Sequence, residues 1–288
     1  MEVSNGLHGG RIIKACVDTE TSNRVFGGRL SLQMESTEHP GVPEILVELV
    51  KTLEDRGLET EGIYRVPGRA SRLQNFIDYV NANPSVVSGR LETAAEPEIL
   101  DSRTISSAIK RFFALLPDSV LKAEDFSSVM TEGLDDKEAT ALTPVKLARL
   151  LVAMRTSLER KFEATPSGDA DTAAAEEVER KWRMATLDFI LRHLREVAAL
   201  QTHNHMSPRA LSLCFAPSLF GCPKRCRTKS LMLELMIEHW PWLTEGLERG
   251  SQGESSEQGS RSFVEARRYA YQYVKFQRHR FFEPDLIV

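Results

Sequence analysis

The sequence predicts an all-α fold. Apolar residues recur at spacings of three and four along most of the chain, which is typical of helices that bury one face. No run of alternating apolar and polar residues is long enough to indicate a sheet. With 41% hydrophobic and 27% charged residues, the chain has the composition of an ordinary globular protein. We therefore expect a helical bundle with a polar N-terminal tail and an extra basic, aromatic C-terminal segment.

Seven amphipathic stretches between residues 43 and 241 predict the helices of this bundle. Pro43 suits the first helical position, where its missing N–H costs nothing, and Gly57 suits the end of that helix. In the third stretch, Ser102 or Thr104 is expected to cap the helix and Pro117 to end it. The later starts and stops are expected at Thr143-Pro144, Ser207-Pro208, Pro217, Thr228 or Ser230, and Pro241.

Composition divides the chain into four parts. Residues 1–24 are polar and lack helical periodicity, so they are expected to be a tail. The helical domain spans 25–248 and contains an acidic, Ala-rich insertion at 163–179 that is expected to be solvated, with a helical end at Ala173–Glu179 left open. Residues 249–260 are rich in Ser, Gly, Glu and Gln, as flexible linkers are. Residues 261–288 form a basic, aromatic C-terminal segment.

Bulk charge and cysteine spacing exclude several function classes. With a net charge of −4, the chain lacks the excess of basic residues that is typical of nucleic-acid-binding proteins. The four cysteines do not have the spacing of a zinc site, so no metal is expected. No 18-residue apolar run and no secretory leader pattern is found, and we expect a cytoplasmic protein.

The most informative segment is Gly62-Ile63-Tyr64-Arg65-Val66-Pro67-Gly68. It presents one arginine on a short loop that is closed by Pro-Gly, just before a predicted helix. Arginine is always charged, planar, and able to donate several hydrogen bonds at once. Such a cation can neutralise the charge that develops on a transferring phosphoryl group in another protein. Taken in isolation, the same pattern also occurs as a plain surface turn with a solvated arginine.

The order of five segments resembles the RhoGAP domain, the activating domain for Rho-family GTPases, over roughly residues 25–247. The opening Val25–Leu30 resembles the family's first element, and residues 61–68 resemble its finger loop, G-[IL]-[FY]-R-x-x-G. The other three segments are Ala108–Pro117, Thr186–Leu194, and the pair Met206–Leu211 with Phe215–Leu219. Five segments in the correct order are far more specific than any one of them.

The resemblance implies binding to a Rho- or Rac-type GTPase in its GTP form and acceleration of GTP hydrolysis. It implies that Arg65 is the catalytic finger and that Lys110 contacts the partner. GTP and Mg²⁺ belong to the partner, so no cofactor of its own is expected. The chain departs from the family pattern at Ala114, where an arginine is usual, and at Ser218, where an asparagine usually braces the finger loop.

These departures leave a second interpretation open. Ser218 is shorter than asparagine, so its brace is expected to be weaker, water-mediated or absent. Arg111 is a candidate substitute for the arginine that Ala114 replaces. With a weakened brace, the domain would be a catalytically weak or inactive module that binds or scaffolds a GTPase. The sequence does not name the target GTPase.

The basic, aromatic segment 261–288 has three open interpretations. It can be a final helix packed on the domain, a docking site for a partner, or a peripheral contact with an anionic membrane. Its aromatic residues fall on several faces of a helix, which favours packing over membrane contact.

Overall fold

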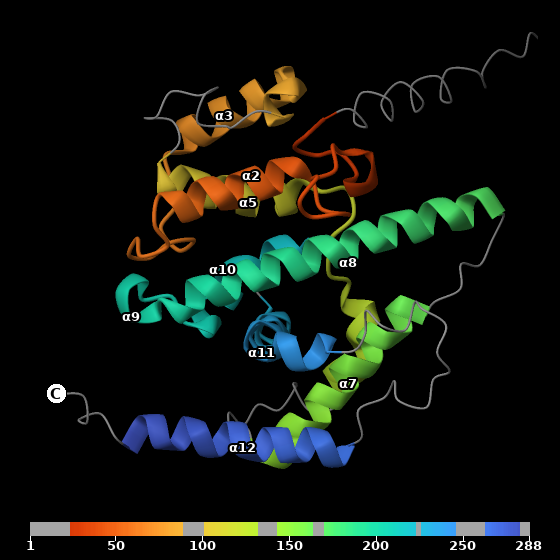
Figure 1. Ribbon diagram of the computed structural model, residues 1–288, viewed down its shortest axis with the longest axis vertical. Coiled ribbons are helices and arrows are strands. Elements are labelled where there is room, and N and C mark those ends of the chain that lie inside the picture. The colour runs from red at the N-terminus through yellow and green to blue at the C-terminus, as the bar shows by residue number, and fades with distance from the viewer. Residues whose placement is uncertain are drawn as a thin grey trace, which may run out of the picture. The chain divides into compact units, whose positions relative to one another are not determined.

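A computed structural model describes residues 24–88, 101–131, 143–163, 170–222, 226–245 and 263–282. Within these ranges every regular element is a helix, and the single β-bridge joins Glu35 and Pro43 (Figure 1). The predicted all-α class is therefore confirmed. Nearly all of the predicted tail (1–24) and all of the predicted linker (249–260) lie outside the described residues. The chain divides into two compact units, Met1–Leu121 with Pro166–Cys226 and Lys122–Thr165 with Arg227–Val288.

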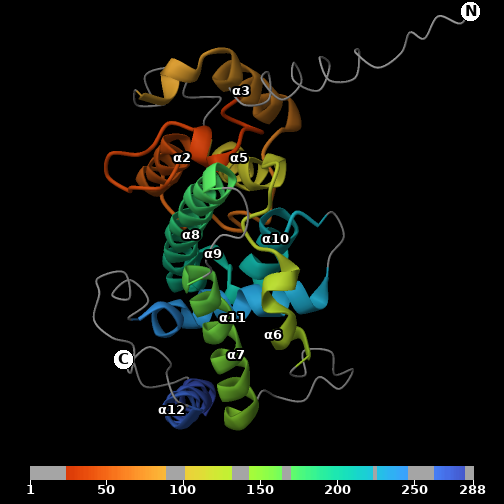
Figure 2. The same cartoon turned by 90° about the vertical axis from the view of Figure 1, so that its right-hand side faces the viewer.

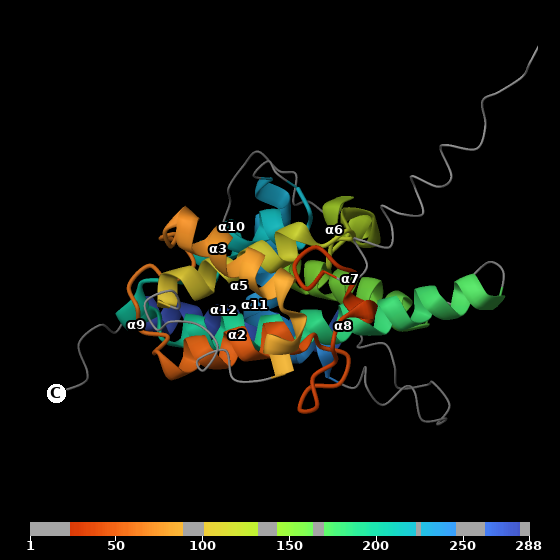
Figure 3. The ribbon, with the colours of Figure 1, turned by 90° about the horizontal axis from the view of Figure 1, so that it is seen from above.

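The first unit is built around one central helix. Its α-helices are α2 (Glu44–Asp55), α3 (Ala70–Ala82), α5 (Ser102–Leu115), α8 (Ala170–Ala199), α9 (Gln201–Asn204) and α10 (Pro208–Leu219). Two 3-10 helices, η1 (Leu30–Leu32) and η2 (Pro84–Ser88), complete it. α5 contacts α2, α3 and α10 (Figure 3), and its apolar stripe is fully buried. This stripe is the one that the sequence predicts, since Ile105, Ala108, Ile109 and Phe112 are all 0% exposed.

The segment before α2 closes the apolar end of this unit. The ring of Phe26 packs edge-on against Phe76 of α3 and Phe112 of α5, with centroids 6.1 and 5.9 Å apart. The backbone N–H of Phe26 donates to Oδ1 of Asn81 at 2.8 Å. These contacts fix the start of the domain on α3 and α5.

The second unit contains η3 (Ala123–Phe126), α6 (Ser127–Thr131), α7 (Pro144–Glu163), α11 (Arg227–Thr244) and α12 (Phe263–Phe282). α12 packs on α7 (Figure 2). Ala266 and Ala270, one turn apart on α12, are fully buried. This is the packed helix that one of the three interpretations of the C-terminal segment predicts. None of the helices in the described ranges is both long enough and apolar enough to cross a bilayer.

Helix ends differ from the sequence predictions at several points. The cap of α5 is Asp101, whose carboxylate accepts from Thr104 N–H at 2.7 Å, and neither Ser102 nor Thr104 acts as the cap. α10 and α11 continue through Pro217 and Pro241 instead of ending there. Each proline lies in the last turns of its helix, where its missing N–H removes one hydrogen bond and no long continuation is disrupted.

α8 is also longer than its apolar stripe predicts. It begins at Ala170, so the helical end that the sequence leaves open at Ala173–Glu179 is part of this helix. That stretch is rich in Ala and Glu, which have high helix propensity without marking a buried face. The Glu177 carboxylate pairs with Lys181 at 3.1 Å, an i,i+4 pair of the kind that supports exposed helices.

Candidate functional site

The loop that carries Arg65 joins α2 to α3 and is folded around the carbonyl of Gly62. The N–H groups of Arg65 and Val66 both donate to Gly62 O at 2.8 Å. Gly62 N–H donates to the carbonyl of Asn204 at 2.8 Å, which ties the turn to the end of α9. Gly62 and Tyr64 both have left-handed backbone conformations, with φ of +68° and +66°. The turn is therefore tightly hydrogen-bonded and conformationally unusual.

Tyr64 points into the core of the first unit. It is 0% exposed, and its ring lies edge-on against Phe215 of α10 with centroids 4.7 Å apart. Its hydroxyl is 2.6 Å from Nε2 of His193, whose Nδ1 is 3.0 Å from Oε1 of Glu54. Burial raises the pKa of Tyr64 well above its usual value, so the hydroxyl stays protonated. That hydroxyl can donate to Nε2 while Nδ1–H donates to Glu54, so one neutral tautomer of His193 satisfies both bonds.

Arg65, the next residue, is exposed. Among the described residues its guanidinium has no hydrogen bond and no ion pair. A Cβ atom added at Gly62 would lie 2.9 Å from Cγ2 of Val66 and 3.5 Å from Nη2 of Arg65. Gly62 thus provides both the positive φ and the space that the turn requires. The loop therefore presents to solvent a cation that no acidic group of the described residues neutralises.

Lys110 is predicted to contact a second protein. In the structure it forms a hydrogen bond to the loop that carries Arg65. Its ammonium group donates a hydrogen bond to the carbonyl of Tyr64. Lys110 is half-buried on α5, and burial lowers the pKa of this ammonium group. The structure therefore brings Lys110 and the Arg65 loop together directly.

The far side of the loop is fastened to the start of α5. Gly68 N–H donates to Oγ of Ser107 at 3.0 Å. A Cβ atom added at Gly68 would lie 2.7 Å from both Cα and N of Thr104, closer than real contacts of this kind. Only glycine permits this approach of the loop backbone to the helix backbone.

The two remaining predicted site residues do not join the loop by hydrogen bonds. Arg111 is exposed on α5, next to Lys110, and makes no ion pair with any described residue. Ser218 is half-buried in the last turn of α10, and its hydroxyl has no hydrogen-bond partner in the described ranges. Ala114 is exposed. The contact of Arg111 and Ser218 with a partner protein stays a prediction.

Asn204 holds the loop from a position that sequence reasoning missed. Its side-chain N–H groups donate to the carbonyls of Leu58 and Val197 at 3.0 and 2.8 Å, and its Oδ1 accepts from Met206 N–H at 2.8 Å. This fully buried amide joins the α2–α3 loop to the end of α8. No short motif in the sequence indicates it, although His193, the other missed residue, lies inside a segment that resembles the family.

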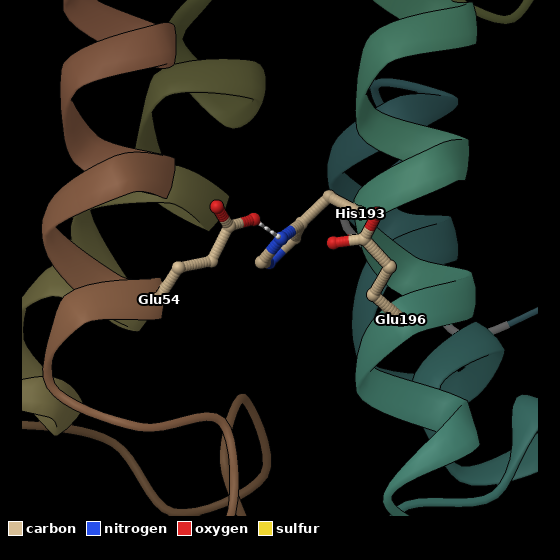
Figure 4. A group of neighbouring side chains, drawn as sticks. All are labelled: Glu54, His193 and Glu196. Carbon is tan, nitrogen blue, oxygen red and sulfur yellow. Dashed lines mark hydrogen bonds and ion pairs between the residues drawn. The ribbon is translucent and has the colours of Figure 1, made fainter.

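Glu54, His193 and Glu196 form a small cluster between α2 and α8 (Figure 4). Each offers one potential ligand atom, and these atoms all lie within 4.8 Å of one another. Imidazole and carboxylates can bind zinc. Here, however, Nδ1 of His193 already bonds Glu54 and Nε2 bonds Tyr64. Internal hydrogen bonds therefore account for the orientation of the ring without an ion.

The sequence pattern of the RhoGAP domain family matches residues 43–157 and 180–224. Rho GTPase-activating protein 23 of Mus musculus is 28% identical over 228 residues, which are 76% of this chain and 13% of the mouse protein. Rho GTPase-activating protein 15 of Gallus gallus is 26% identical over 225 residues, 76% of this chain and 40% of the chicken protein. The chain thus spans less than half the length of either relative.

A solved structure supports the fold independently. The crystal structure of human Rho GTPase activating protein 15 aligns with a TM-score of 0.56 at 18% identity, covering 83% of this chain and 99% of that chain. The family pattern covers more than half of the 288 residues, and its first stretch includes both Arg65 and Lys110. The chain belongs to the RhoGAP domain family.

Proposed function

We propose that this chain activates GTP hydrolysis by a Rho- or Rac-type small GTPase, and that Arg65 is its catalytic finger. One observation carries the proposal: Arg65 is exposed and has no ion-pair partner in the described ranges, while the residue before it is buried and bonded. The side chain is therefore available to a partner, and its backbone is held in place.

The chemistry follows from charge. As the γ-phosphoryl group transfers to water, negative charge spreads over its oxygens and the leaving group. A guanidinium supplied by a second protein is worth roughly 10³–10⁵ in rate, which corresponds to about 4–7 kcal/mol of the barrier. The partner would provide the nucleotide, the Mg²⁺ and the residue that orients water. This chain would need no metal or nucleotide of its own.

Lys110 would hold the Arg65 loop in place, in addition to contacting the GTPase. Its bond to Tyr64 O holds the residue next to the finger, and a fixed backbone limits the loss of electrostatic benefit that loose placement causes. Arg111, exposed beside it, would contact the GTPase surface, as would Ser218. A charged contact such as that of Arg111 affects association and selectivity more than the chemical step.

The test is single-turnover GTP hydrolysis by a panel of Rho-family GTPases in their GTP form, at saturating concentrations of this chain. Wild type should accelerate phosphate release by at least one GTPase, and Arg65→Ala should remove about 10³ of that acceleration. Arg69→Ala is the matched control, because Arg69 is also an exposed arginine of the same loop. It should leave the saturated rate within about twofold.

Two results would contradict the proposal. If acceleration survives Arg65→Ala, another group performs the chemistry. If the chain binds the GTP form tightly without changing its turnover, it is a binding or scaffold module. The second result would agree with the exposed Ala114 at the position where the family usually has an arginine.

A further inference from the structure

Tyr64 has a backbone conformation that its side chain does not favour. Its φ of +66° lies in the left-handed region, which residues with a Cβ atom rarely adopt. Such conformations persist only where surrounding contacts impose them, and they gather at functional sites. The contacts that impose this one therefore determine where the next side chain, Arg65, begins.

Packing supplies one part of that constraint. The Tyr64 ring is fully buried and lies against Phe215. A phenylalanine would fill the same space, so packing alone does not require the hydroxyl group. The hydroxyl instead makes a 2.6 Å bond to Nε2 of His193, which is itself 3% exposed.

Glu54 supplies the other end of the chain of bonds. Its carboxylate accepts from Nδ1 of His193 at 3.0 Å, as Figure 4 shows, and so fixes both the ring orientation and its tautomer. Glu54 lies on α2 and His193 on α8, so these bonds fix the position of the turn relative to two helices of the first unit. Lys110 of α5 bonds the carbonyl of the same tyrosine. Side chain and main chain of Tyr64 are thus held separately.

We propose that His193 is a positioning residue for the reaction: through Tyr64, and with Glu54 behind it, it sets the direction in which Arg65 projects. This inference rests on the function proposed above. His193 touches neither nucleotide nor partner in this scheme and acts through the backbone of the turn. Its loss should therefore lower the catalytic benefit of Arg65 and leave the affinity for the GTPase nearly unchanged.

The experiment is a double-mutant cycle on partner GTP hydrolysis, with kcat and KM measured for the GTPase as substrate. His193→Gln is combined with Arg65→Ala, and each variant is compared with wild type. In the wild-type background His193→Gln should lower kcat about 10-fold or more, because small misplacements of a catalytic group cost this much, and change KM less than about twofold. In the Arg65→Ala background it should cause no further loss.

A purely structural role gives a different pattern. If His193→Gln only reduced the folded fraction, kcat would fall by the same factor in both backgrounds, and that result overturns the inference. An effect on KM alone also overturns it. Glu196→Gln is the matched control, since this carboxylate lies in the same cluster and makes no hydrogen bond to the loop. It should leave kcat within about twofold.

Tyr64→Phe provides the second route to the same answer. It keeps the buried ring and removes the hydroxyl, so it should lower kcat in the same direction even if His193→Gln fails to fold. A Tyr64→Phe variant with wild-type kcat overturns the inference. If Arg65→Ala itself retains full activation, the proposed function fails together with this inference. If Arg65→Ala is inactive and the His193 and Tyr64 variants are normal, the inference fails alone.

Discussion

Two arginines of this chain have opposite surroundings. Arg155 of α7 is 3% exposed in the second unit, and its Nε bonds Glu159 at 2.7 Å. Its Nη1 donates to the carbonyls of Leu243 and Glu245 at 2.7 and 2.8 Å, where α11 ends. Arg65 is exposed and has no such partners among the described residues.

The comparison separates an arginine that serves the fold from one that is available to a second protein. Arg155 satisfies carbonyl groups that a helix end leaves without partners, and its charge is neutralised by Glu159. The loop around Arg65 is instead held by contacts of Tyr64, Lys110 and the backbone, and the Arg65 guanidinium takes no part in these contacts. Removing Arg65 should therefore lower activity and leave stability unchanged. Removing Arg155 should lower stability and leave the activity of the folded protein unchanged.

The largest expected effect is that of Arg65→Ala on the reaction. We expect about 10³ or more to be lost from the saturated rate, roughly 4 kcal/mol, with the free energy of unfolding unchanged within about 0.5 kcal/mol. Urea unfolding followed by circular dichroism, beside the hydrolysis assay, measures both. A large loss of stability would place Arg65 with Arg155 as a structural residue.

Arg155→Ala should show the reverse pattern. Removing one partner of a buried pair leaves Glu159, 15% exposed, without its cation, and we expect about 3–5 kcal/mol of unfolding free energy to be lost. The fraction that stays folded should retain the wild-type rate at saturation. Arg160→Ala, at an exposed position of the same helix, is the control and should change stability by less than about 0.5 kcal/mol.

Gly68→Ala tests the contact between the Arg65 loop and α5. The new methyl group would meet the backbone of Thr104 at 2.7 Å, and neither main chain can give way easily. We expect about 1–3 kcal/mol of lost stability together with slower activation, because the loop must move off α5. Wild-type thermal unfolding and wild-type kcat in this variant would show that the close approach is unimportant.

The smallest effect concerns a carboxyl group in the second unit. Burial raises the pKa of Glu238, so the folded state holds a proton that the unfolded state loses at lower pH. Its contribution to stability is thus fully present below the unfolded pKa and is lost as pH rises through the folded pKa. Glu238→Gln should stabilise the protein at neutral pH by up to about 1 kcal/mol, and the gain should vanish at low pH. Thermal melts at several pH values measure it, and a gain that does not depend on pH would contradict the assignment.

Sequence reasoning could predict the helices whose apolar stripes are regular. α2, α5 and α7 lie where the spacing of leucines, isoleucines and phenylalanines predicts them. The apolar stripe marks α8 only from Trp182 onward, because the alanines and glutamates before it favour a helix without marking a buried face. The prediction that Pro217 and Pro241 end their helices is wrong, because a proline near a helix end costs little.

The site was predictable only where its residues are close in sequence or lie in a motif. Arg65 and Lys110 could be named from the loop and helix patterns. The bond between Tyr64 and His193 spans 129 positions and that between His193 and Glu54 spans 139. No local pattern reports such pairings, because they arise from the packing of α8 against the rest of the first unit. The side-chain contacts that hold the Arg65 loop are therefore visible in the structure and not in the sequence.

The most direct test of the central claim uses a transition-state mimic. Binding is measured between this chain and its GTPase loaded either with a non-hydrolysable GTP analogue or with GDP and aluminium fluoride. A group that acts in the transition state should contribute mainly to the second complex. We expect Arg65→Ala to weaken the aluminium fluoride complex at least about 100-fold and the GTP-analogue complex by less than about threefold. Equal weakening of both complexes would mean that Arg65 binds the GTPase without acting on its chemistry.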